Sequence, residues 1–275
     1  MNVLIVGAGA MGQWFGRAVT DDDIAVTFAD LEEDRARAAA GAVGGSVDRR
    51  TDLSEPPAEA PGYDAVCLAV PLTTIEEAIA THANRADRAI LDVSGVMAGP
   101  LEAMATHAPD LERVSLHPLF APERAPGSIA AVSAASGPVT DRLLEALTAS
   151  GNTILETTAA EHDRAMSSVQ AATHAAVLAF ALSAEPVPDG FETPIYDELS
   201  TLAAYVTGGT PRVYRDIQET FDGADDVAAA ARAVAVAEGE EFDALYERAA
   251  EQWAAADEEL TGQSENTTIH SGDDE

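Results

Sequence analysis

The sequence predicts an α/β fold, with a doubly wound parallel sheet in its first part and an all-helical domain after it. Short apolar runs alternate with helical segments up to about residue 156, which is typical of a parallel sheet covered on both faces. After Glu156 the apolar spacing is helical and no further strand is evident. We therefore expect an α/β domain over residues 1–156, a helical domain over 157–261 and a disordered acidic tail over 262–275.

Seven apolar runs bounded by polar or turn residues are expected to be the strands. They are Val3–Val6, Ile24–Ala29, Ala65–Val70, Ala89–Val93, Arg113–Leu116, Ile129–Val132 and Thr153–Leu155. The helical domain is expected to begin with one long helix over Ala159–Ser183. Further helices are expected over Ile195–Val206, Pro211–Glu219, Asp225–Glu238 and Glu241–Leu260.

The charge of the chain is strongly negative. It carries 48 Asp and Glu against 15 basic residues, a formal net charge of −33, and every basic residue is arginine. Such a field repels nucleic acids and anionic membranes, so neither is an expected partner. Apolar residues make up 47% of the chain and charged residues 23%, which favours a globular protein over a disordered acidic one. We expect a halophilic protein, since molar salt screens self-repulsion within ~3 Å.

The cysteine content and the N-terminus also bear on the class of protein. Cys67 is the single cysteine and lies in an apolar run, so no disulfide framework is possible. The chain begins on a strand, without a basic leader, and no stretch approaches ~18 uninterrupted apolar residues. We expect a cytoplasmic protein without a membrane span.

A glycine-rich loop follows the first predicted strand and opens a helix. In this loop, Gly7 is expected to make the tight turn, Gly9 to let the backbone approach a pyrophosphate, and Gly12 to let helix and strand pack closely. Free N–H groups at the start of the helix favour phosphate. The pattern is that of a dinucleotide-binding Rossmann fold. Its cofactor-binding residues are expected to be Gly7, Ala8, Gly9, Ala10, Met11 and Gly12.

Asp30 ends the second predicted strand, where a carboxylate would accept the ribose hydroxyls of the cofactor. A carboxylate at this position repels the 2′-phosphate of NADP, and the following residues offer no nearby cation. NAD is therefore expected rather than NADP. Arg35 and Arg37 keep NADP open.

Three further segments end at the carboxyl edge of the predicted sheet, where α/β proteins bind ligands. Val70 and Pro71 follow one strand, Ser94 follows the next, and His117 follows a third and is held by Pro118. A neutral histidine can take a proton from an alcohol at neutral pH, which oxidation of a hydroxyl requires. Ser94 could hydrogen-bond to the hydroxyl or to the imidazole.

The chain resembles the prephenate dehydrogenases over nearly its full length. The shared motifs occur in the family's order: Gly7-x-Gly9-x-Met11-Gly12, Asp92-Val-Ser94, Leu116-His117-Pro118-Leu-Phe, and Glu161-His162-Asp163 through His174. The resemblance implies that His117 is the general base and that Ser94 assists it. It also implies that His174 binds substrate and that Glu123 gates the pocket.

The chain also departs from the family. Many relatives have a lysine shortly after the serine, where this chain has Met97. The family also expects an arginine of the helical domain to bind a substrate carboxylate. Arg212 is the first choice and Arg215 the second. His162 is expected to have a structural role in the first turn of its helix, while His82, His107 and His270 are expected at the surface.

The resemblance implies an oxidative decarboxylation of prephenate to 4-hydroxyphenylpyruvate in tyrosine biosynthesis, with arogenate as the alternative substrate. The substrate would be a small dicarboxylate, so a protein this acidic needs local cations to capture it. No His/Cys cluster has metal-ligand spacing, so no metal is expected. Apolar faces along Val169–Leu182 and Val227–Val236 predict a homodimer formed through the helices, and the resemblance implies the same.

Other classes of NAD-binding protein share part of this pattern. β-Hydroxyacid dehydrogenases and ketopantoate reductases share this architecture but use a catalytic lysine, and the chain contains none. A pyrroline-carboxylate reductase would not explain the His117-Pro118 loop. A non-catalytic NAD-binding sensor stays open, because a fold alone does not establish activity.

Overall fold

The computed structural model describes residues 1–48 and 62–266, and within them eight strands form one sheet in the order β3-β2-β1-β4-β5-β6-β7-β8. The strands are β1 (Asn2–Val6), β2 (Ala25–Ala29), β3 (Ser46–Val47), β4 (Tyr63–Leu68), β5 (Ala86–Asp92), β6 (Glu112–Pro118), β7 (Ser128–Ala135) and β8 (Thr153–Glu156). The first six are parallel, β7 runs antiparallel to β6, and β8 runs parallel to β7. The predicted α/β fold is confirmed. Strand β3 was not predicted, because two residues make no apolar run.

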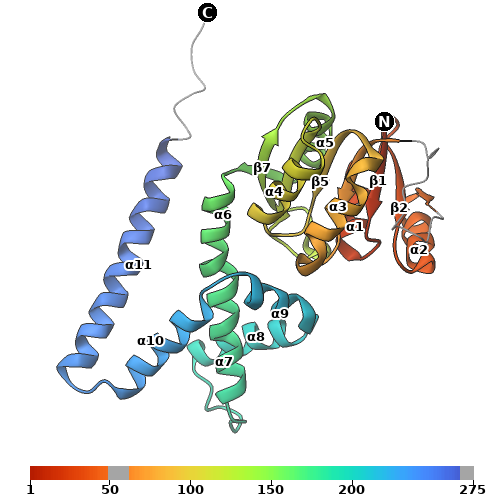
Figure 1. Ribbon diagram of the computed structural model, residues 1–275. Coiled ribbons are helices and arrows are strands. Elements are labelled where there is room, and N and C mark those ends of the chain that lie inside the picture. The colour runs from red at the N-terminus through yellow and green to blue at the C-terminus, as the bar shows by residue number, and fades with distance from the viewer. Residues whose placement is uncertain (49–61, 267–275) are drawn as a thin grey trace, which may run out of the picture. The chain divides into compact units, whose positions relative to one another are not determined.

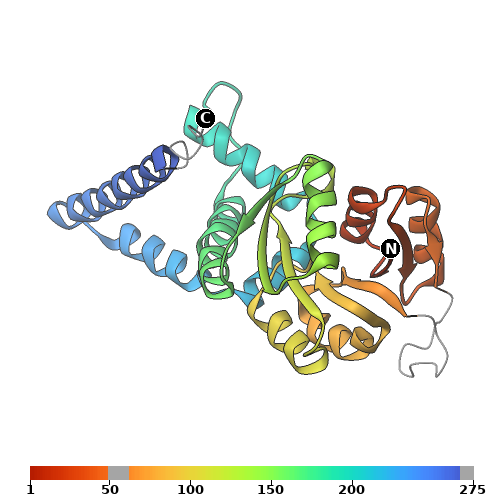
Figure 2. The same ribbon diagram turned by 90° about the horizontal axis from the view of Figure 1, so that it is seen from above.

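Helices cover both faces of the sheet (Figures 1 and 2). They are α1 (Ala10–Val19), α2 (Glu33–Val43), α3 (Ile75–His82), α4 (Ala98–His107) and α5 (Pro138–Ala149). Successive strand residues face opposite sides, so Val3 and Ile5 of β1 lie in a core closed by α1, α2 and α5. Leu4 and Val6 lie in the other core, closed by α3 and α4. The sheet is therefore buried on both faces, as its continuous apolar strands require.

The part of the chain after β8 is helical. Its elements are α6 (Ala159–Met166), the π-helical segment η4 (Ser167–Ala172), α7 (Thr173–Ser183), α8 (Pro194–Thr207), α9 (Pro211–Thr220), α10 (Ala224–Val236) and α11 (Glu240–Asn266). The helical rod from α6 to α7 is continuous (Figure 1). Helix α11 extends into the segment predicted as a disordered tail, and residues 267–275 lie outside the described residues.

The chain forms two compact units, Met1–Gly223 and Ala224–Glu275. The change from strands to helices falls at the predicted position, but the first compact unit continues through α9. A small apolar cluster explains this: Met166 and Ile217 pack with Leu72 and Val96, which follow β4 and β5. Helices α6 to α9 are thereby tied to the carboxyl edge of the sheet.

Within the described residues, one helical stretch, Ala159–Ser183, is long and apolar enough to cross a membrane, with a mean hydropathy of 1.4. This is weak evidence for a span, because core helices of soluble proteins meet the same criterion. The same stretch carries His162 and Gln170, which meet a strand residue of the sheet, as described below.

Candidate active site

The glycine loop has a geometry that only glycine permits. Gly7 has a φ of +100°, and a Cβ on it would lie 2.3 Å from the carbonyl oxygen of Ala69. A Cβ on Gly12 would lie 2.0 Å from the carbonyl oxygen of Gly7. At Gly9, by contrast, a Cβ would meet no described atom within 4 Å, so this side of the loop faces open space. Gly9 caps α1 without a side chain, which leaves the N–H groups of the first turn free for a pyrophosphate.

Asp30 lies beside this loop at the end of β2. One carboxylate oxygen accepts a hydrogen bond from the N–H of Ala8 at 2.8 Å, and the other accepts one from the N–H of Glu32 at 2.9 Å. Arg35 pairs with Glu32, and Arg37 pairs with Glu33 and Asp34. Both arginines that kept NADP open are therefore already next to carboxylates.

The predicted edge residues lie in the order of their strands. The glycine loop follows β1, Val70 and Pro71 follow β4, Ser94 follows β5, and His117 lies in β6. Neighbouring strands are about 4.8 Å apart, so three strand steps place His117 about 14 Å from the glycine loop along this edge. In a nicotinamide dinucleotide the pyrophosphate joins the adenosine to the nicotinamide riboside, so a cofactor held at the glycine loop would extend its nicotinamide along this edge toward His117.

His117 is buried, with 7% of its surface exposed. Nε2 of His117 lies close to Gly95, which follows β5. Gly95 has a φ of +94°, and a Cβ on it would lie 3.0 Å from that nitrogen. Burial first, and then the nearby His162, lower the pKa of His117 from 6.5 to about 3, against the opposing effect of Asp163. His117 is therefore a neutral imidazole at neutral pH.

A second histidine contacts His117 directly. Nδ1 of His117 lies 2.9 Å from Nε2 of His162, and Nδ1 of His162 lies 2.8 Å from Oδ1 of Asp163. His162 is in the first turn of α6, as predicted, but it is buried and points to His117 rather than serving only the helix. Asp163 accepts hydrogen bonds from the backbone N–H groups of Met97 and Ala98 at the start of α4.

Ser94 is held by Asp92, the last residue of β5. Both the N–H and the hydroxyl of Ser94 donate hydrogen bonds to Oδ2 of Asp92. Burial raises the pKa of Asp92 to about 6, although hydrogen bonds from Ser94 and Ser115 oppose the shift. The hydroxyl hydrogen of Ser94 is therefore directed to Asp92 in this structure.

The π-helical segment η4 brings Gln170 to His117. The amide nitrogen of Gln170 lies 3.3 Å from Nε2 of His117. The side-chain amide of Gln218, in α9, donates a hydrogen bond to the carbonyl of Ala171 at 2.9 Å and so stabilises the widened turn. Single π-helical turns often mark functional sites, since they re-aim side chains within a helix.

His174 lies one turn further along the same rod and packs edge-on against Tyr214, with 4.9 Å between ring centroids. Nδ1 of His174 is buried and has no hydrogen-bond partner among the described residues. Burial, and then the nearby Tyr205, raise the pKa of Tyr214. The guanidinium of Arg124 lies 4.5 Å above the ring of Tyr205. His174 thus packs on Tyr214, and Arg124 packs on Tyr205.

The two predicted substrate arginines lie elsewhere on α9. Arg212 and Arg215 both flank Asp216, at 3.4 and 3.6 Å, and Asp216 is only 4% exposed. Half or more of each arginine side chain is exposed. Glu123 is exposed in the short turn η3 (Pro122–Arg124), next to Arg124.

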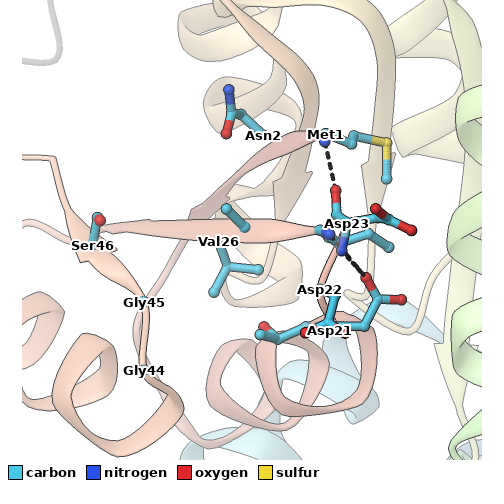
Figure 3. Close-up of a pocket in the computed structure, with 12 residues that line it drawn as sticks. Met1, Asn2, Asp21, Asp22, Asp23, Val26, Gly44, Gly45 and Ser46 are labelled. Carbon is cyan, nitrogen blue, oxygen red and sulfur yellow. Dashed lines mark hydrogen bonds between the residues drawn. The ribbon is translucent and has the colours of Figure 1, made fainter.

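Figure 3 shows a hollow lined by Met1, Asp21, Asp22, Asp23 and Ser46, at the opposite edge of the sheet from His117. In the described part of the chain, no three His, Cys, Asp or Glu residues are grouped to hold a metal ion. His82, expected at the surface, is buried: its helix turns it inward, where Nδ1 lies 3.3 Å from a guanidinium nitrogen of Arg85. His270 lies outside the described residues.

The similarity to a characterised enzyme decides the family. The chain is 34% identical over 237 residues to a 4-amino-4-deoxyprephenate dehydrogenase of Streptomyces pristinaespiralis, and the match covers 81% of this chain and 78% of the relative. The chain belongs to the prephenate dehydrogenase family. The model of the prephenate dehydrogenase nucleotide-binding domain matches residues 15–137.

Solved structures of the family have the same fold. The prephenate dehydrogenase of Aquifex aeolicus, in complex with hydroxyphenyl propionate and NAD+, superposes with a TM-score of 0.64 at 17% identity, over 98% of this chain and 96% of that chain. Synechocystis arogenate dehydrogenase superposes with a TM-score of 0.61 at 16% identity, over 97% and 98%. At these identities the likeness shows the fold alone.

In this member of the prephenate dehydrogenase family, sequence reasoning missed several residues of the site. Gly95 follows Ser94 directly, and its glycine was a signal for a close approach. Asp92 is part of the Asp92-Val-Ser94 motif but was not given a role. The contacts of His162 and Gln170 with His117 join residues 45 and 53 positions apart, and no local pattern reveals such a contact.

Proposed function

We propose that this chain catalyses the nicotinamide-dependent oxidative decarboxylation of prephenate, with His117 as the general base. The observation that carries the proposal is the placement of His117. Its Nε2 lies close to Gly95 at the carboxyl edge of the sheet, the same edge at which the glycine loop follows β1. Family membership gives the class of reaction, an oxidation of a cyclohexadiene ring that ends in an aromatic product.

The chemistry requires a base that can take a proton and return it. A bound nicotinamide would accept the hydride from the ring carbon that carries the hydroxyl. Nε2 of His117 takes the hydroxyl proton as that carbon is oxidised. When CO2 leaves and its bond electrons make the ring aromatic, His117 returns the proton to the ring oxygen. Ser94, whose hydroxyl donates to Asp92, would turn that hydroxyl to the substrate oxygen and donate a hydrogen bond to it while His117 takes the substrate's own hydroxyl proton.

We propose NAD as the cofactor. The open face at Gly9 and the uncapped start of α1 fit a pyrophosphate, and Val70 and Pro71 border the path toward His117. The carboxylate of Asp30 lies beside the loop, and Arg35 and Arg37 are paired with acids. A 2′-phosphate would therefore meet negative charge without a free cation.

We propose that Arg124 and His174 help capture the carboxylates of the substrate. Arg124 belongs to η3, which packs against α1, and it reaches across to Tyr205 of α8. His174 adds a buried ring nitrogen that needs a partner. Arg212, the choice from sequence, and Arg215 remain candidates, but Asp216 already offsets their charge. Glu123, which is exposed next to Arg124, is the proposed gate of the substrate pocket.

A second candidate substrate is 4-amino-4-deoxyprephenate. The relative at 34% identity is named for that activity, and it matches most of the chain. In that compound an amine replaces the ring hydroxyl, and the same neutral base could take its proton. Arogenate, which differs in the side chain instead, is the third substrate to compare.

The test is NADH formation from each of the three substrates in ~3 M KCl, a concentration at which charges are screened within a few Å. We expect turnover of prephenate by the wild type and a loss of about 10²-fold or more in kcat for His117→Asn, with NAD binding retained. Preference for the amine would change the assigned substrate. NAD binding without turnover of any of the three would favour the non-catalytic sensor.

We also propose that the chain works as a homodimer. In the first unit, large apolar side chains are exposed along the rod and α8. They include Val169, Leu182, Ile195 and Leu202. An apolar surface of this kind is usually covered in a soluble protein. Light scattering in ~3 M KCl should give twice the monomer mass. A mass that stays at 28.5 kDa at all protein concentrations would refute the dimer.

A further inference from the structure

We propose that Asp163, acting through His162, fixes which nitrogen of His117 carries the proton, and that both are positioning residues for the base. The inference rests on the proposed function of His117 as a base, and it concerns two residues that do not touch the reacting atoms. It follows from a chain of three hydrogen bonds that joins α4, α6 and β6.

The chain starts at Asp163, which can only accept. Its carboxylate receives the N–H of Met97 at 3.2 Å and the N–H of Ala98 at 3.1 Å. Burial favours a protonated carboxyl, but hydrogen bonds from His162 and from these two N–H groups outweigh it and lower the pKa of Asp163 below its usual value. Asp163 is therefore an anion at neutral pH with no proton to give.

The second step concerns His162. Its Nδ1 lies 2.8 Å from Oδ1 of Asp163, so Nδ1 must donate. In the neutral form of the imidazole, which has one N–H, Nε2 of His162 is left with a lone pair and becomes an acceptor. The proton on His162 is thus located by the charge of Asp163.

The third step reaches the base. Nε2 of His162 lies 2.9 Å from Nδ1 of His117, and it accepts, so Nδ1 of His117 must donate. Nε2 of His117 is then left without a proton, on the side of Gly95. The amide N–H of Gln170, at 3.3 Å from that nitrogen, agrees with this assignment because it can only donate.

The opposite tautomer could not work as a base. With its proton on Nε2, His117 would present an N–H to the substrate and could not accept a proton there. Asp163, His162 and His117 form the relay. It passes no proton to solvent, because the reaction returns the proton to the product. Its task is to keep Nε2 unprotonated before the reaction, and to place the negative charge of Asp163 behind the imidazolium while the proton is held.

The experiment reads the tautomer directly, by ¹⁵N chemical shifts of labelled histidine in the protein without substrate. We expect wild-type His117 to be protonated at Nδ1. His162→Leu removes the acceptor for Nδ1 of His117 but leaves the carboxylate of Asp163 bound to the N–H groups at the start of α4. Asp163→Ala removes the anion. In both variants we expect the Nε2–H form of His117 to become the major one. His162→Gln, which offers an amide oxygen near the position of Nε2, should restore the Nδ1–H form.

Glu161→Ala is the matched control, since Glu161 is an acid in the same helical turn but binds the hydroxyl of Thr157 instead. It should leave the tautomer unchanged. In activity assays, His162→Leu should lower kcat about 10²-fold with little change in KM, and His162→Gln should recover much of the loss.

The two proposals can fail separately. If the wild type turns over none of the three substrates, the proposed function fails, but the ¹⁵N measurement still tests the relay. If wild-type His117 carries its proton on Nε2, or if His162→Leu leaves the tautomer unchanged, the inference is overturned whatever the activity.

Discussion

The imidazole rings of His117 and His162 meet at an angle of 73°, with Nδ1 of one ring 2.9 Å from Nε2 of the other. One ring belongs to a strand of the sheet and the other to the first helix after it. The orientation of His117 therefore depends on the part of the chain that follows the nucleotide-binding domain, and the sheet alone does not fix it.

Gly95 leaves room for the imidazole of His117, so Gly95→Ala should damage the site. A non-glycine residue at its φ of +94° costs about 1–2 kcal/mol, and the new Cβ would press on Nε2 of His117 at 3.0 Å. We expect lower thermal stability and a large loss of kcat. Gly41→Ala is the control, because Gly41 is helical and a Cβ there meets no described atom within 4 Å. It should be neutral or stabilising by up to about 1 kcal/mol. Equal effects of the two variants would contradict the assigned role of Gly95.

Stability should depend on pH through His117. Its pKa is about 3 in the folded protein and 6.5 in the unfolded chain, so the unfolded chain binds more protons between these values. The contribution of His117 to the free energy of unfolding is therefore fully present above pH 6.5. It is lost as the pH falls toward 3, at up to about 1.4 kcal/mol per pH unit.

Asp92 shifts in the opposite sense, because its pKa is raised to about 6, and its contribution falls as the pH rises from 3.8 to 6. Comparison of the wild type with His117→Asn separates the two groups, since Asp92 is present in both. We expect the free energy of unfolding of the wild type, measured in urea relative to that of His117→Asn, to rise by about 2 kcal/mol from pH 5 to pH 7. A constant difference between the two would contradict the low pKa of His117.

Cofactor choice should depend on Asp30. We expect the wild type to use NAD with a higher kcat/KM than NADP. Asp30→Asn removes the negative charge and keeps one acceptor for the N–H of Ala8, so the preference for NAD should fall about tenfold, or about 1.4 kcal/mol. Glu33→Gln, which alters a nearby acid that pairs with Arg37, is the control and should change the ratio little. A wild type that prefers NADP would refute the assignment.

Substrate capture should depend on Arg124 more than on the arginines of α9. Arg124→Ala should raise the substrate KM about tenfold at little cost in kcat, because it removes the cation that we propose to bind a substrate carboxylate. Arg212→Ala and Arg215→Ala are matched truncations of residues whose charge Asp216 already offsets. A larger KM effect for Arg212→Ala than for Arg124→Ala would return the role to the residue chosen from sequence.

Thermal stability should rise with salt. At a net charge of −33, self-repulsion destabilises the folded chain, and screening within ~3 Å at 1 M relieves it. We expect Tm to increase from 0.1 M to 1 M KCl by more than it does in a sucrose solution of equal osmolality, which adds no ions. A Tm independent of KCl would remove the halophilic assignment.

The sequence predicted the fold because its signals are local. The strand at Val3–Val6, the glycine loop and the helix from Ala10 are neighbours in the chain, and their apolar spacing and glycine positions are readable without the rest of the molecule. The rod from Ala159 to Ser183 was readable for the same reason, although its π-helical turn was not, because its spacing still looks helical.

The sequence by itself determined the α/β sheet, and it predicted that the glycine loop and His117 lie at the carboxyl edge of that sheet. Only the tertiary structure decided what orients that histidine, why Ser94 turns to Asp92, and where the arginines lie. The physical reason is that a proton on an imidazole is located by its hydrogen-bond partners, and here those partners come from helices far along the chain. Contacts between distant segments depend on how the elements pack, and no local pattern of residues specifies them.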